Sequence, residues 1–359
     1  MRFISPLIRT MNMKQIRRLD FQEALKRYRE EDLLSLGAMA DGMRQQLHPE
    51  NVVTYVVDRN INYTNICCSG CRFCAFFRPP GHAEGYLITK ESLHSKIEET
   101  LALGGTQILL QGGMHPGLAL DYYRDLLGFI KGNFSIHIHG FSPPEIHYLA
   151  RIEGISVRDT LEALMDAGLG SIPGGGAEIL AERVRKKISP NKCTDGEWLA
   201  VMETAHELGL RSTATMMFGH VETVEERLEH LFKIRDLQDR TGGFTAFIPW
   251  TFQPENTSLS VPKATSAEYL RLLALSRLVL DNIPNIQASW VTQGPKIAQV
   301  ALKFGANDLG STMIEENVVA AAGVAFSLSR EEMIRIIETA GFHARQRDTF
   351  YNPVCMRDK

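Results

Sequence analysis

Cysteine is scarce along most of this chain, and several other features are missing from it. Of six cysteines in 359 residues, four lie within INYTNICCSGCRFCAFFR at residues 61–78. There is no Lys/Arg-rich run and the net charge is −3, so neither nucleic acid nor an anionic membrane is indicated as a partner. No stretch reaches the roughly 18 apolar residues of a membrane span, and the polar N-terminal region does not resemble a secretory signal. We therefore expect a cytoplasmic protein.

The composition is that of a globular protein with a large core, with 44% hydrophobic and 23% charged residues. From residue 51 to residue 328, short apolar segments alternate with helical patterns, which is typical of parallel βα units. A β-rich stretch precedes the cysteines. The other expected strands are 106–111, 135–139, 169–173, 212–218, 244–250, 286–290 and 306–311. Eight such units predict an α/β fold, a (β/α)8 TIM-type barrel.

Both ends of the chain lack the alternation of strands and helices that predicts the barrel. Residues 1–50 are expected to form an N-terminal helical extension, with amphipathic helices over about 14–48 and a stop at Pro49. Residues 51–328 form the barrel. Ser329 and Glu332 have capping-box spacing, which predicts a helix to about Ala340. Residues 329–359 are thus expected to be a C-terminal helix and polar tail packed on the barrel.

The four clustered cysteines allow two ligand registers. Cys68, Cys71 and Cys74 resemble the start of a ferredoxin run, but Arg78 occupies the place of its fourth cysteine. Cys67, Cys71 and Cys74 would hold three irons of a 4Fe–4S cluster and leave the fourth iron open. Cys68 is then a neighbour of the site and not a ligand.

Two plainer interpretations stand beside these. One is a structural zinc site completed by His82, although its spacing is unusual; the other is a group of inert buried thiols. The isolated Cys193 and Cys355 are interpreted as structural or merely exposed.

Other candidate site residues follow the expected strands, where barrel enzymes place their active sites. Gln111, Gly112 and Gly113 follow the second strand. The segment 173–178 brings three glycines and Glu178, and Arg183 or Arg185 could pair with a carboxylate. His137 and His139 share one strand face by period two, as do Thr213, Thr215 and Met217, whereas Met216 and Phe218 are expected to pack outward. Further polar candidates in the loops are His220, Gln253, Ser289, Thr292, Gln293, Asp308, Ser311 and Thr312.

The spacing Cys67-x3-Cys71-x-Phe73-Cys74 resembles the signature of the radical S-adenosylmethionine (SAM) superfamily. This resemblance implies a 4Fe–4S cluster with three cysteine ligands and SAM bound at the open iron. It also implies a 5′-deoxyadenosyl radical that removes a hydrogen atom from the substrate. The residues it assigns to the cofactor are Phe73, Gln111, Gly112, Gly113, Glu178 and Arg183.

A narrower resemblance runs from about residue 14 to the end of the sequence. The segments NYTNICCSGCRFCAFFR, IPGGGAEIL, AHELGLRSTATMMFGH and QRDTFYN resemble the futalosine-route enzymes of menaquinone biosynthesis and the related deazaflavin synthases. Together with SWVTQGPKIAQVALKFGANDLGSTMIEENVVAAAG, they look most like the enzymes that cyclise dehypoxanthine futalosine.

That resemblance implies abstraction of the C4′ hydrogen of the substrate ribose and addition of the carbon radical to the benzoate ring. His137, His139 or a loop carboxylate would then remove the ring proton. The substrate residues expected from it are Thr213, Thr215, His220, Gln293, Ser311 and Thr312. The expected partners are a small nucleoside substrate and an external electron donor such as flavodoxin or ferredoxin.

Three alternatives remain open from the sequence. Aminofutalosine synthase uses the same cluster but adds the radical to an enol ether, and a deazaflavin synthase subunit comes next. A non-catalytic iron–sulfur electron-transfer protein belongs to another class. It predicts a fully ligated cluster that does not respond to SAM.

Overall fold

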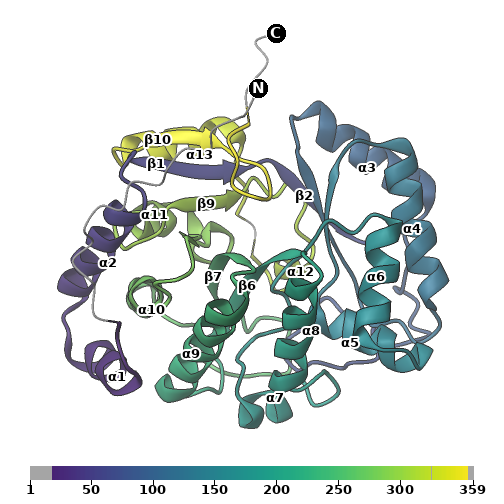
Figure 1. Cartoon of the computed structure of the whole chain (residues 1–359), viewed down its shortest axis with the longest axis horizontal. Helices are drawn as coiled ribbons and strands as arrows, with labels where there is room; N and C mark the ends of the chain where they lie inside the picture. Colours follow the sequence, from purple (N-terminus) through teal and green to yellow (C-terminus); the bar gives the residue numbers. More distant parts are fainter. Residues whose placement is uncertain (1–17, 325, 355–359) are drawn as a thin grey trace, which may run out of the picture.

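Parallel strands surrounded by helices form the body of the protein (Figure 1). The computed structural model describes residues 18–324 and 326–354. Seven strands make one sheet in the order β2-β3-β4-β5-β6-β7-β8, and all neighbouring pairs are parallel. Their bounds are β2 Asp58–Asn62, β3 Gln107–Gln111, β4 His137–Gly140, β5 Ser171–Ile172, β6 Arg211–Phe218, β7 Phe244–Thr251 and β8 Asn285–Ile286. This order confirms the predicted succession of βα units.

A second sheet, in the order β10-β1-β9, closes the ring. Its strands are β1 Val52–Val56, β9 Asp308–Ser311 and β10 His343–Gln346. Only Val57 separates β1 from β2, so the two act as one bent strand that pairs with β9 in its first half and with β3 in its second. A bridge between Gln287 and Asp308 joins the end of β8 to β9. The ring confirms the predicted (β/α)8 barrel.

Helices follow the strands and cover the outside of the ring (Figure 1). Their bounds are α1 Phe21–Glu30, α2 Leu33–Leu47, α3 Lys90–Ala102, α4 Leu120–Asn133, α5 Pro143–Glu153, α6 Val157–Ala167, α7 Glu182–Ile188, α8 Asp195–Glu207, α9 Val224–Thr241, α10 Ser266–Val279, α11 Trp290–Ala301, α12 Val318–Ala321 and α13 Arg330–Thr339. The predicted N-terminal helices are α1 and α2, and α2 packs against α10. Residues 14–17 of that prediction lie outside the described part of the chain.

Several helix starts are determined by local sequence. In a capping box, the hydroxyl of the first residue and the carboxylate three positions later each accept a backbone N–H that the helix leaves unpaired. Among the described helices, α5, α6, α8, α9, α10 and α13 begin in this way. The box predicted at Ser329 and Glu332 is present at the start of α13.

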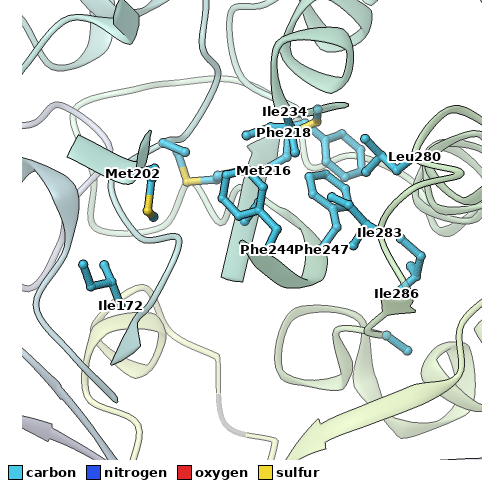
Figure 2. Packing of buried hydrophobic residues seen from close by; sticks show 14 of the residues in the cluster. Ile172, Met202, Met216, Phe218, Ile234, Phe244, Phe247, Leu280, Ile283 and Ile286 are labelled. Atoms are coloured by element: carbon cyan, nitrogen blue, oxygen red, sulfur yellow. The ribbon is translucent and has the colours of Figure 1, made fainter. Parts of the chain in front are cut away.

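The apolar core lies between the strands and the outer helices (Figure 2). Along β6, Met216 and Phe218 are fully buried in this core, which confirms their predicted outward packing. Figure 2 shows Phe218 of β6, Phe247 of β7 and Ile234 of α9 among the residues of this cluster. Burying one such side chain contributes about 1.5–3 kcal/mol. Period-two alternation therefore leaves the other face of β6 free for the inside of the ring.

Two expectations near the C-terminal end were wrong. The strand predicted at 286–290 ends at Ile286, and α11 already begins at Trp290, whose indole donates to the carbonyl of Ser311 at 2.9 Å. The segment predicted as polar tail contains β10, which pairs with β1 alone and therefore needs no alternating apolar face. Cys355 lies outside the described residues. No described helix is long and apolar enough to span a bilayer.

Candidate active site

The inside of the barrel is hollow, although such barrels are usually filled by side chains. The cavity has a volume of about 280 Å³, close to the roughly 300 Å³ at which ligand pockets begin. Residues in or directly beside each strand of the ring line its wall. The C-terminal segment adds Arg347, Thr349 and Tyr351. Thr349 donates a hydrogen bond to Gln107 at the start of β3, so this segment closes the floor of the cavity.

The cavity separates the predicted site residues into two groups. Those that line it are Gln111, His139, Glu178, Thr213, Thr215, Ser289, Thr292 and Ser311. Those outside its lining are Phe73, Gly112, Gly113, His137, Arg183, His220, Gln253, Gln293, Asp308 and Thr312. Cys67, Cys71 and Cys74 are also outside the lining, in the loop after β2.

Two loops after neighbouring strands meet at the cysteines. The backbone N–H groups of Ser69 and Met114 both point at Cys67 Sγ, each at 3.4 Å. Ser69 Oγ lies 2.9 Å from the buried Cys71 Sγ. Cys68 differs from the others because it is exposed, whereas Cys67 and Cys74 are half-buried. This difference favours the register Cys67, Cys71, Cys74 over the ferredoxin-like one.

The loop fits an iron–sulfur cluster better than a single metal ion. Within the described residues, no three His, Cys, Asp or Glu side chains converge on one ion position, so a zinc site with His82 finds no support. A cluster instead spreads its thiolates over separate irons, and its sulfurs accept N–H hydrogen bonds. The two N–H groups at Cys67 match that requirement.

Gly112 and Gly113 lie directly against the cysteine loop. The N–H of Gly112 donates to the buried Glu145 at 3.0 Å. A Cβ on Gly113 would lie 2.2 Å from the carbonyl oxygen of Ile66 and 2.8 Å from Cys67 Cβ. Only glycine permits this approach, so Gly113 determines how closely the two loops pack.

We expect Gly113→Ala to lower the free energy of unfolding by about 1–3 kcal/mol, because the added methyl group overlaps backbone that cannot move freely. Gly128→Ala on α4 is the matched control. A Cβ there meets nothing within 4 Å, and alanine should stabilise the helix by about 0.5–1 kcal/mol. Denaturant unfolding measures both changes, and equal values would contradict the close loop contact.

Glu145 holds the loop that contains Gly112 and Gly113, here called the glycine loop. The sequence analysis did not identify Glu145 as a site residue. Its carboxylate accepts hydrogen bonds from the Tyr63 hydroxyl at 2.6 Å, the Gly112 N–H at 3.0 Å and the Ser142 N–H at 2.7 Å. Burial raises the pKa of Glu145, and these hydrogen bonds oppose the rise. The available signal was the capping-box spacing of Ser142 and Glu145, although it does not reveal the bond to Gly112.

A half-buried cation lies beside the cysteine loop. Lys192 Nζ is 2.9 Å from Glu178 Oε1 and 5.0 Å from the centre of the Phe73 ring. Burial raises the pKa of the Cys71 thiol to about 11, and the charge of Lys192 opposes that rise. Glu178 lines the cavity, so the pair links the cavity wall to the cysteine loop.

Neither arginine of α7 lines the cavity. Arg183 is exposed and forms a bidentate pair with Glu226 at 2.7 and 2.6 Å. Arg185 is buried but donates to the backbone carbonyls of Cys193 at 2.6 Å and Ala177 at 2.7 Å. Lys192 is also outside the cavity lining, but unlike Arg183 it lies beside the cysteine loop, next to Phe73.

The two histidines of β4 face the same side but occupy different depths. His139 is buried and lines the cavity, whereas His137 is half-buried and meets the edge of the Phe350 ring at 5.1 Å. Ser171 Oγ lies 2.6 Å from His139 Nδ1 and 2.7 Å from His137 Nε2. Burial lowers the pKa of His139 to about 3 and that of His137 to about 4. Both rings are therefore neutral at pH 7.

Thr213 and Thr215 line the cavity while holding the glycine-rich segment after β5. Thr213 Oγ1 accepts the N–H of Gly174 at 3.0 Å, and Thr215 Oγ1 donates to the carbonyl of Gly174 at 2.6 Å. A Cβ on Gly174 would lie 2.7 Å from the Cα of Ala214. These hydroxyls thus position the backbone of Gly174, in addition to any contact with a ligand.

Three other predicted polar residues lie outside the cavity lining. The His220 side chain is fully buried beside Glu222, at 3.0 Å. Gln293 donates to the Thr251 hydroxyl at 2.5 Å. Thr312 Oγ1 is buried without a hydrogen-bond partner among the described residues.

Three polar residues at the cavity floor were missed by the sequence analysis: Asp58, Gln107 and Arg347. Asp58 accepts hydrogen bonds from the Ser311 hydroxyl and from Gln107 Nε2, the latter at 2.6 Å. Burial raises the pKa of Asp58, and these two bonds oppose the rise. Arg347 forms a buried bidentate pair with Asp308 at 2.5 and 3.0 Å. Asp58 and Asn60 show period-two spacing along β2, which was the usable signal.

Two family models match this chain. Residues 61–234 match the Radical SAM superfamily, and residues 241–358 match the CofH/MqnC C-terminal region. The first match contains the cysteine loop, the glycine loop and Lys192. The second contains the cavity residues from Ile248 to Tyr351.

Relatives with three different names share most of the chain. A cyclic dehypoxanthine futalosine synthase of Halalkalibacterium halodurans is 48% identical, over 93% of this chain and 91% of its own. A 5-amino-6-(D-ribitylamino)uracil–L-tyrosine 4-hydroxyphenyl transferase of Methanopyrus kandleri is 42% identical, over 84% of each chain. An aminodeoxyfutalosine synthase of Thermus thermophilus is 40% identical, over 96% of this chain and 94% of its own.

Solved structures share the fold at low sequence identity. The FeFe-hydrogenase maturase HydG of Carboxydothermus hydrogenoformans has a TM-score of 0.75 at 17% identity, covering 93% of this chain and 77% of that chain. Methylornithine synthase (PylB) has a TM-score of 0.71 at 18% identity, covering 91% and 94%. The barrel architecture, the cysteine loop, the two family models and the relatives agree: this chain belongs to the radical SAM superfamily, in the group that carries a CofH/MqnC C-terminal region.

Proposed function

We propose that this protein is a radical SAM cyclase that converts dehypoxanthine futalosine to its cyclic product in menaquinone biosynthesis. The observation that carries the choice is the 48% identity to a relative of that name, against 42% and 40% for the relatives with other names. A cavity enclosed by the barrel agrees with it, because a radical must be kept from water and held close to its target.

In this proposal Cys67, Cys71 and Cys74 hold a 4Fe–4S cluster, and SAM binds beside it. When bound, this pair would supply the radical chemistry that the proposed reaction needs, which is abstraction of the C4′ hydrogen followed by addition to the benzoate ring. The N–H groups at Cys67 stabilise its thiolate form. An external one-electron donor such as flavodoxin or ferredoxin is required, and residues 51–328 would form the catalytic barrel.

The SAM contacts follow from the residues next to the cysteine loop. Gly112 and Gly113 let their backbone approach the methionyl amine, and Glu178 offers a carboxylate from the cavity wall. Lys192 replaces Arg183 as the cation for the methionyl carboxylate, because it lies beside the thiols whereas Arg183 pairs with Glu226. Phe73 and Gln111 border the same region.

The substrate contacts follow from the cavity wall. Asp58 and Ser311 on the floor suit the hydroxyl groups of a ribose. His139 is neutral and lines the wall, so it can accept the proton that the ring loses. Thr213 and Thr215 contribute to the same wall.

The test uses the anaerobically reconstituted protein with its cluster verified by iron content. Dithionite reduces the cluster, and SAM cleavage is measured with and without dehypoxanthine futalosine. We expect substrate-stimulated 5′-deoxyadenosine and a cyclised product lighter than the substrate by a pair of hydrogen atoms. Cleavage without that product would exclude the cyclase.

The second candidate is aminofutalosine synthase, which the relative from Thermus thermophilus favours. It is distinguished by supplying an enol-ether substrate in the same assay, because only that enzyme adds the radical to such a double bond. A cluster-loaded protein that leaves SAM intact would instead favour an electron-transfer role.

A further inference from the structure

Three polar side chains form a continuous line from the cavity toward the lower end of the barrel. Ser171 is 1% exposed and lies opposite His139 in the pairing of β5 with β4. Its Oγ is within hydrogen-bond distance of both rings, at 2.6 Å from His139 Nδ1 and 2.7 Å from His137 Nε2. Among the described residues, no hydrogen bond occupies His139 Nε2, and His139 lines the cavity.

The hydroxyl of Ser171 has one proton, which restricts the hydrogen bonds that it can form with the two histidines. It can donate to only one neutral histidine and must accept from the other. When Ser171 donates to His137 Nε2, His139 carries its proton on Nδ1 and presents the lone pair of Nε2 to the cavity. In this arrangement His139 is a base toward a ligand, and His137 can take up a proton through Ser171.

We propose that His139, Ser171 and His137 form a proton relay that removes the ring proton from the cavity during rearomatisation. This inference rests on the proposed cyclisation. The ring C–H bond breaks and its proton goes to His139 Nε2. The Nδ1 proton of His139 passes to Ser171, whose own proton passes to His137 Nε2. The remaining ring electron leaves to a one-electron acceptor of the iron–sulfur class.

The surroundings of the two rings favour movement toward His137. His139 is buried and lies close to the positive Arg347, which disfavours its protonated form. Burial also lowers the pKa of the half-buried His137; the charge of Asp348 opposes this shift and that of Lys131 adds to it. Because His137 is the less buried of the two rings, the His137 end of the relay is where solvent can take the proton.

The first test is Ser171→Ala, with Ser212→Ala as the matched control. Ser212 is also 1% exposed on a neighbouring strand and also contacts a histidine, His206 Nε2 at 2.7 Å, but it does not line the cavity. We expect Ser171→Ala to keep formation of 5′-deoxyadenosine and to lower the cyclised product per 5′-deoxyadenosine by about 10-fold or more. Ser212→Ala should leave this ratio unchanged.

Deuterium at the ring position that loses its proton sharpens this test. In Ser171→Ala it should lower the product ratio further, because proton removal has become slow, whereas the control should respond as the unchanged protein does. Equal product ratios in the two variants would overturn the relay. If the unchanged protein forms no cyclised product at all, the result counts against the proposed function instead.

Histidine tautomers give a readout that does not depend on the reaction. Nitrogen NMR of histidine-labelled, cluster-loaded protein should show both His137 and His139 neutral and protonated on Nδ1. Ser171→Ala should shift the signals of both rings, and Ser212→Ala only that of His206. A proton on His139 Nε2 would overturn the proposed direction of transfer, whatever the substrate.

Discussion

Replacing Cys71 by serine is expected to abolish the cluster and to lower SAM cleavage by more than about 100-fold. Mutating a residue that only supports a metal ligand lowers activity by up to about 100-fold, so loss of a ligand itself should cost more. A hydroxyl is a poor substitute for the soft thiolate that iron–sulfur clusters select. Cys71 is the buried member of the three proposed ligands, so serine would also leave a polar group where thiolate and iron are proposed to meet. Iron content and 5′-deoxyadenosine formation measure the two effects.

Two other cysteines provide matched controls for this variant. Cys68 is exposed within the same loop, and Cys193 is buried outside it. Cys68→Ser and Cys193→Ser should both keep the iron and the cleavage. Loss of the cluster in Cys68→Ser with retention in Cys67→Ser would show that the ferredoxin-like register is the correct one.

Arg347→Met is expected to lower the free energy of unfolding by about 3–5 kcal/mol, because it leaves a buried carboxylate without its cation. Arg347 and Asp308 form a bidentate pair whose side chains are 7% and 0% exposed. After the change, the donors that Asp308 keeps among the described residues are neutral, the Thr54 hydroxyl at 2.5 Å and the Gly310 N–H at 2.8 Å. Denaturant unfolding of the cluster-loaded protein measures the loss.

The control is another bidentate arginine pair, this time on the surface. Arg183→Met removes the partner of Glu226 at an exposed position, where such pairs contribute less than about 1 kcal/mol. The double variant Arg347→Met/Asp308→Asn should recover much of the loss, because it removes the uncompensated charge. A loss from Arg347→Met no larger than that from Arg183→Met would contradict a buried ion pair in the floor.

Most of the fold could be predicted because its signals are local. The eight strand positions follow from apolar runs of strand length between helical patterns, and a capping box marks its helix start within four residues. β10 could not be predicted in this way, because it is an edge strand of polar residues. It forms only by pairing with β1, which lies near the other end of the sequence. The end of β8 was also missed, because the hydrogen bond from Trp290 of α11 to Ser311 of β9 helps to determine where the chain turns.

By itself, the sequence determined the cysteine loop, the glycine loops and the barrel, since spacing along the chain brings those groups together. Only the tertiary structure decided that Lys192, and not Arg183, stands beside the thiols. It also decided that His139 reaches the cavity while His137 lies below it, and that Thr349 closes the floor against Gln107 across 242 positions of sequence. The physical reason is that strand periodicity tells inside from outside, whereas depth in the barrel and the partner of a long side chain depend on distant residues.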